Sequence, residues 1–161
     1  MMKIEARLEE LGFILPEPLA LPPGTRLPFP WVRVRGKRAF ISGHGPQRPD
    51  GSLAGPFGKV GAEVSAEQAY EAARMIALSM LGSLKRQLGD LDRVTAWLRV
   101  FGMVNCAPDF SGQPAVINGF SDLILAVYGK VAGTHARSAV GMASLPFNIP
   151  VEIEAEVEID G

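Results

Sequence analysis

Cysteine and histidine are scarce in this sequence of 161 residues, which contains one cysteine, Cys106, and two histidines. A single cysteine cannot form an internal disulfide, and one thiol with two imidazoles is too few for a zinc site unless carboxylates contribute. Cys106 has no basic or metal-binding neighbours in the sequence, so we expect a buried and unreactive thiol. These absences exclude a disulfide scaffold and the cysteine-rich zinc modules.

An excess of charge of either sign is also lacking, because 16 Lys and Arg face 17 Asp and Glu, for a net charge of -1. Such a balance gives no electrostatic footprint for nucleic acid. No apolar run is long enough to span a bilayer, and the charged N-terminus lacks the apolar segment of a signal peptide. We therefore expect a soluble cytoplasmic protein, and its length and 47% hydrophobic content are typical of one globular domain.

The order of the predicted elements indicates an α+β sandwich. Helical spacing of apolar residues predicts helices over 3–12, 65–88 and 114–130; β-branched and alternating patterns predict strands at 31–43 (a hairpin), 93–105, about 135–144 and 151–159. The longest helix is the clearest, since Ser65 and Gln68 form a capping box and Gly89 ends it. The resulting β-β-α-β-α-β-β order predicts two helices on one face of a mixed sheet.

Two segments have the composition of irregular structure. Residues 15–30, "LPEPLALPPGTRLPFP", are too rich in proline for a helix or a central strand, so we expect an extended arm on the surface or on a neighbouring subunit. The glycine- and proline-rich residues 43–61 form a loop of a length that is more often functional than idle. We divide the chain into residues 1–28, a helix and an arm, and residues 29–161, one globular domain.

Arg137 stands among small residues in the predicted strand "THARSAVG". By strand parity it shares a face with Ala139, Gly141 and Ala143, which leave room beside it. A guanidinium binds a carboxylate through two parallel hydrogen bonds, so Arg137 is a candidate for holding a ligand. The alternative is a structural salt bridge to one of the glutamates of the last strand. His135 lies on the same face, where it either donates a hydrogen bond or fills the rim.

The last strand, "VEIEAEVEI", alternates apolar residues with Glu152, Glu154, Glu156 and Glu158. Such a row is usually the solvated face of a strand, but Glu152 differs because it directly follows the preceding loop. If the last two strands formed a simple hairpin, Glu152 and Arg137 would lie on the order of 20 Å apart. We therefore expect these two to share a site only through another strand order or across a subunit interface.

His44 lies in "SGHGP", where the backbone N–H groups beside Gly43 and Gly45 are suited to binding an anion. The alternative is an ordinary turn histidine. The aromatic residues nearby, Phe29 and Trp31, either line an apolar pocket or belong to the core or an interface.

The segment "ARSAVGMASLPFNIPVEIEA" resembles the C-terminal signature of the RidA (YjgF/endoribonuclease L-PSP) family: an arginine, small residues, a short apolar strand, Leu-Pro, and a strand with alternating glutamates. The resemblance extends to "FISG" at 40–43, "LGDLDRVTAWLRVFG" and "INGF" at 117–120, and it covers residues 29–159. Residues 1–28 and the "SGHGP" loop resemble a longer branch of the family, whose chemistry is largely unassigned. The resemblance implies a chorismate-mutase-like α+β fold, a homotrimer with ligand sites in the clefts between subunits, and no metal or organic cofactor.

The resemblance also implies roles for particular residues. Imine deaminases of the family hydrolyse reactive enamines and imines to 2-keto acids and ammonia. By position, Arg137 would grip the substrate carboxylate, and Glu152 would position or activate the hydrolytic water. The remaining pocket residues would be Ser42, Gly43 and Asn118.

Three pocket positions depart from the deaminase pattern. Phe29 stands where the family has a tyrosine, Ala139 where it often has a cysteine, and His44 where glutamine is common. The resemblance therefore leaves open imine hydrolysis, another imine or carbonyl substrate, or metabolite binding without turnover in a regulatory trimer. The near-neutral charge weighs against RNA cleavage, the activity in the older family name.

Overall fold

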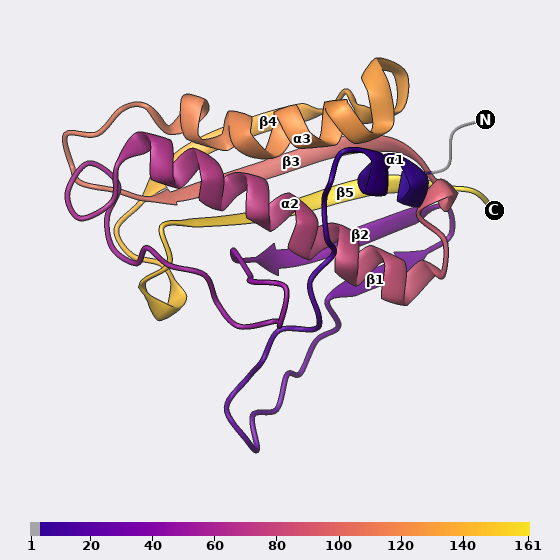
Figure 1. Ribbon diagram of the computed structural model, residues 1–161, viewed down its shortest axis with the longest axis horizontal. Coiled ribbons are helices and arrows are strands. Elements are labelled where there is room, and N and C mark those ends of the chain that lie inside the picture. Colours follow the sequence, from indigo (N-terminus) through magenta and orange to yellow (C-terminus); the bar gives the residue numbers. More distant parts are fainter. Residues whose placement is uncertain (1–3) are drawn as a thin grey trace.

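A five-stranded mixed sheet with two long helices on one face forms the body of the structure, a computed structural model that describes residues 4–161 (Figure 1). The elements are α1 (Ile4–Glu10), β1 (Val32–Arg35), β2 (Arg38–His44), α2 (Ala66–Leu88), η1 (Leu91–Arg93), β3 (Val94–Asn105), α3 (Gln113–Gly133), β4 (Ala136–Met142), η2 (Pro146–Asn148) and β5 (Val151–Ile159). This order confirms the predicted α+β sandwich with both long helices on one side of the sheet.

The order of strands in the sheet is β1-β2-β5-β3-β4. β5 pairs antiparallel with both β2 and β3, whereas β4 pairs parallel with β3 at the edge. The last two strands are therefore not a hairpin. β5 takes a central place because its apolar row, including Val151, Ile153 and Val157, is fully buried beneath the helices.

The two long helices pack closely on the sheet and on each other. α2 begins at Ser65 with the predicted capping box, in which the Ser65 hydroxyl accepts from the Gln68 backbone, and it ends at Gly89. α3 lies against β3 at Gly102, where a Cβ would overlap the side chain of Ile117. By length and composition alone α3 also qualifies as a membrane span, but its buried stripe faces the core of this domain.

The proline-rich arm crosses the surface without regular structure and returns to β1 as a projecting loop (Figure 1). Four hydrogen bonds hold its first half: the N–H groups of Glu17 and Ala20 donate to the carbonyls of Pro49 and Gly51, and the side chains of Gln47 and Arg86 donate to arm carbonyls. The arm is thus fixed against the glycine-rich loop and the end of α2.

Candidate small-molecule site

The Arg137 side chain is held by α3 rather than by a carboxylate. Its Nη1 donates to Asn118 Oδ1 at 2.8 Å and to Ser121 Oγ at 3.1 Å, and its Nη2 donates to the Pro114 carbonyl at 3.2 Å. Within residues 4–161, Arg137 forms no ion pair, so the alternative of a salt bridge to a glutamate of the last strand is wrong within the single chain. The guanidinium is therefore oriented, while its charge has no counterion among the residues that the structure describes.

His135 extends this hydrogen-bond network. Its Nδ1 lies 2.7 Å from the Gly133 carbonyl, which only accepts, so Nδ1 carries the proton and Nε2 accepts from Ser121 Oγ at 2.9 Å. Burial lowers the pKa of His135; the bond to the Gly133 carbonyl opposes this effect, and the charge of Arg137 adds to it. His135 is thus neutral at pH 7 and fixes Ser121, which in turn fixes Arg137.

Glu152 lies on the other face of the sheet. Arg137 is opposite Val100 and Glu152 is opposite Met103, and residues an odd number apart along β3 point to opposite faces. Val100 is fully buried under the helices, so Arg137 is on the helical face and Glu152 is not. Within one chain, the sheet therefore separates the two residues.

Glu152 borders a cavity of about 350 Å³ at the end of β2, where the pairing with β5 shifts register. We call this cavity the arm chamber, because the arm residues Leu19, Leu21, Leu27 and Phe29 form one side of it. Trp31, Leu53, Phe147 and Ile149 supply most of the remaining apolar lining. The chamber is therefore a mainly apolar space with one carboxylate at its edge.

Gly43 makes room for the Glu152 carboxylate. A Cβ at residue 43 would lie 2.5 Å from Glu152 Oε2, so any larger residue would displace the acid. Burial, followed by the charge of Glu154, raises the pKa of Glu152. A half-buried carboxylate with a raised pKa is the kind of group that accepts a proton during catalysis.

His44 forms a wall of the chamber, with 3% of its surface exposed. Its Nδ1 lies 2.6 Å from the Ser42 carbonyl and its Nε2 lies 2.8 Å from Ser83 Oγ, so the ring donates to the carbonyl and accepts from the hydroxyl. Burial lowers the pKa of His44 to about 4, although the bond to the carbonyl acts the other way. The ring is neutral at pH 7 and stands 5.2 Å from that of Trp31.

The residues expected to form one pocket thus fall into two groups. Arg137 and Asn118 lie together beside α3; Phe29, Gly43, His44 and Glu152 lie together at the chamber. Ser42 lies next to the chamber lining and its hydroxyl donates to the Pro30 carbonyl, whereas Ala139 packs against the core under α3.

Ser121 and the leucines of the arm were not identified from the sequence as residues of a site. Ser121 lies three residues after Asn118, hence on the same side of α3, and that spacing could have identified it. The leucines of the arm carry no such signal, because an irregular segment has no period from which a facing direction can be deduced.

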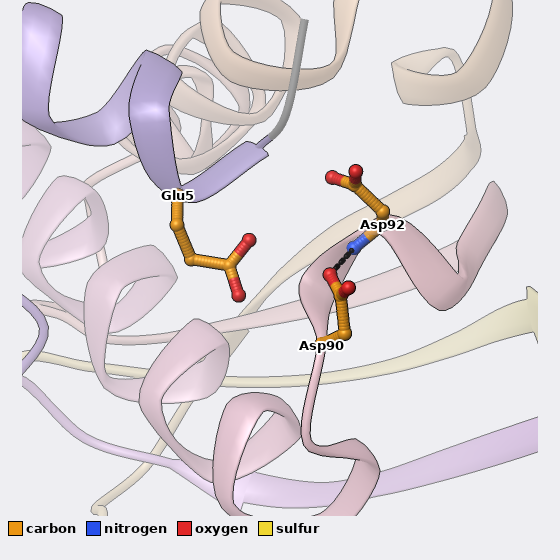
Figure 2. A group of neighbouring side chains, drawn as sticks. All are labelled: Glu5, Asp90 and Asp92. Atoms are coloured by element: carbon orange, nitrogen blue, oxygen red, sulfur yellow. Dashed lines mark hydrogen bonds between the residues drawn. The ribbon is translucent and has the colours of Figure 1, made fainter. Parts of the chain in front are cut away.

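Three carboxylates also cluster away from these groups, at Glu5, Asp90 and Asp92 (Figure 2). Asp90 accepts from the Asp92 N–H, Asp92 accepts from the Ile4 N–H, and Glu5 accepts from Lys85 and from the Leu91 N–H. Burial raises the pKa of Glu5, but these hydrogen bonds outweigh it and the net pKa is lowered. The cluster joins α1 to the turn after α2, which accounts for it as a structural feature.

Fold and pocket together define a chorismate-mutase-like α+β protein with a small-molecule cavity. Residues 5–155 match the family described as "YjgF/chorismate_mutase-like, putative endoribonuclease". The chain belongs to this YjgF/RidA family, and family membership supports a role in binding small molecules.

Three relatives cover almost the whole chain. Protein TCP17 of Trypanosoma cruzi is 38% identical over 98% of this chain and 95% of its own length. The crystal structure of Atu1372 from Agrobacterium tumefaciens, of unknown function, is 42% identical with a TM-score of 0.87, covering 98% of this chain and 92% of that one. A putative endoribonuclease from Shewanella oneidensis MR-1 is 28% identical with a TM-score of 0.86, covering 98% and 100%. The match to full-length relatives includes the arm.

Proposed function

We propose that the protein binds a small imine or enamine that carries a carboxylate, and hydrolyses it to a 2-keto acid and ammonia. The observation that carries this proposal is the state of Arg137. Three hydrogen bonds orient its guanidinium, yet no carboxylate of residues 4–161 neutralises it. A preorganised arginine without a counterion is suited to a ligand carboxylate.

Glu152 supplies the second half of the proposed site. Water adds to the imine carbon, and the Glu152 carboxylate accepts the proton that the water loses. That proton passes to the nitrogen and gives a carbinolamine. A second proton then moves from the carbinolamine hydroxyl to the nitrogen, by way of Glu152, as the carbon–nitrogen bond breaks, so that ammonia leaves and the 2-keto acid remains. An enamine first gains a proton at carbon and loses one from nitrogen to become the imine, and the overall reaction consumes one molecule of water.

Because the sheet separates Arg137 from Glu152 within one subunit, the proposal requires that they come from different subunits. We therefore propose a homotrimer in which Arg137 of one subunit approaches the chamber of the next. Light scattering tests this directly, since a monomer of 17.2 kDa would leave each subunit with only half of the site.

The test of activity uses 2-aminoacrylate and 2-iminobutanoate, generated in situ by a serine/threonine dehydratase, with 2-keto acid release followed against the uncatalysed rate. We expect acceleration by the wild type and its loss in Arg137→Ala. Arg137→Lys keeps the charge but not the paired donors, and we expect it to lower kcat/KM by about a hundredfold. Arg33→Ala, an exposed arginine on β1, is the matched control and should retain activity.

Binding without turnover is distinguished in the same experiment. If the wild type does not accelerate hydrolysis but 2-ketobutyrate still raises its melting temperature in an Arg137-dependent manner, the protein binds the acid without hydrolysing it. Absence of both effects would remove the carboxylate site altogether.

A further inference from the structure

We propose that the arm chamber receives a bulky apolar side chain of the substrate, so that the preferred substrates are 2-imino acids with a branched or aromatic side chain rather than those with a methyl or ethyl group. This inference rests on the proposed function for the position of the reacting carbon, beside Glu152. The expected size and apolar character of the substrate side chain follow from the volume and the lining of the chamber.

The chamber is too large for the smallest imino acids. An apolar cavity of about 150 Å³ is enough to hold benzene. The arm chamber, at about 350 Å³, has room for such a ring in addition to the imine and carboxylate groups. A substrate with a methyl side chain would leave most of its apolar lining in contact with water.

The polar side chains of the chamber are already engaged. His44 and Ser83 bond to each other, Thr25 donates to the Pro22 carbonyl, and Gln47 donates to the Glu17 carbonyl. Glu152 is the polar lining residue that makes no side-chain hydrogen bond within residues 4–161. Within the part of the chain that the structure describes, the chamber therefore presents one carboxylate without a side-chain hydrogen bond beside an apolar surface, which fits an imine carbon that bears an apolar side chain.

The arm supplies the apolar wall on which this preference for bulky side chains depends, although it is not part of the sheet. Its backbone is held to the loop at Pro49 and Gly51, immediately before Leu19 and Leu21 reach the chamber. A Cβ at Gly51 would overlap the Pro18 carbonyl oxygen, and its φ of +89° also favours glycine. The position of the apolar wall is thus fixed by close backbone contacts rather than by the leucines alone.

The experiment compares imino acids that an amino-acid oxidase produces in situ from phenylalanine, leucine and alanine. We expect kcat/KM to be at least about tenfold higher for the phenylalanine and leucine products, because each added methylene in an apolar pocket is worth about tenfold or more. Leu21→Trp fills the chamber and should lower the ratio of the phenylalanine to the alanine product by about tenfold or more. Ile14→Trp, at an exposed position directly before the arm and outside the chamber, is the control and should keep the ratio.

Equilibrium binding of phenylpyruvate and pyruvate, measured by calorimetry, separates this inference from the proposed hydrolysis. Tighter binding of phenylpyruvate by about tenfold, abolished by Leu21→Trp, supports the chamber even if no imine is hydrolysed. Equal turnover of all three imines, with equal binding of the two keto acids, overturns the chamber inference and leaves the hydrolysis intact. If Leu21→Trp fails to fold, Leu27→Ala replaces it, because it removes part of the apolar wall without adding volume. A lower ratio of kcat/KM for the phenylalanine product to that for the alanine product supports the chamber inference, and an unchanged ratio overturns it.

Discussion

Mild acid should destabilise the protein through His44, which is buried as a neutral ring between the Ser42 carbonyl and the Ser83 hydroxyl. The folded protein lowers the pKa of this ring from 6.5 to about 4, with burial as the main cause and the charge of Arg86 as a smaller one. Between these values the unfolded chain binds a proton that the folded chain does not. The free energy of unfolding therefore falls as the pH falls from about 6.5 towards 4.

The size of the effect follows from the two pKa values. At about 1.4 kcal/mol per pKa unit, the interval corresponds to about 3 kcal/mol once His44 is protonated in both states, and to about 2 kcal/mol at pH 5. That is a large part of the stability of an ordinary domain, which is about 5–15 kcal/mol.

Urea unfolding at pH 7.5 and pH 5, at one protein concentration, measures this contribution. His44→Gln removes the titrating ring but keeps an amide that can bond to Ser83. We expect the wild type to lose about 2 kcal/mol more than His44→Gln between the two pH values. His135 titrates in both proteins, so its contribution cancels. If the difference between wild type and variant is the same at both pH values, the proposed environment of His44 is wrong.

Two further variants test the site and the packing that supports it. Glu152→Gln should abolish imine hydrolysis yet raise the urea midpoint at pH 7, because the raised pKa of Glu152 means that folding disfavours the ionised carboxylate. This gain in stability should vanish below about pH 4, where the acid is protonated in both the folded and the unfolded state. A gain that does not depend on pH would contradict this explanation. Gly119→Ala should lower the free energy of unfolding by about 3 kcal/mol in the same assay, because the alanine Cβ would overlap the Tyr70 carbonyl where α3 crosses α2. A free energy of unfolding within about 0.5 kcal/mol of the wild type would be inconsistent with that contact.

The sequence by itself determined the local elements, because their signals lie within a few residues. The capping box at Ser65, the terminal Gly89 and the hairpin within residues 31–43 are all observed where they were predicted. The alternation of glutamates and apolar residues from 151 to 159 correctly identified which side of the last strand is buried. The surroundings of Arg137 and the family signature likewise singled out the arginine as a candidate ligand-binding residue.

Strand order and the sides on which the candidate residues lie were decided by the tertiary structure. The insertion of β5 between β2 and β3 follows from burying its apolar row at the centre of the sheet, which no local pattern specifies. Parity along β3 then places Arg137 and Glu152 on opposite faces, although they are only fifteen positions apart in the sequence. The arm chamber likewise arises from contacts between the arm, the glycine-rich loop and η2, three segments without periodicity, so its shape and apolar character could be read only from the folded chain.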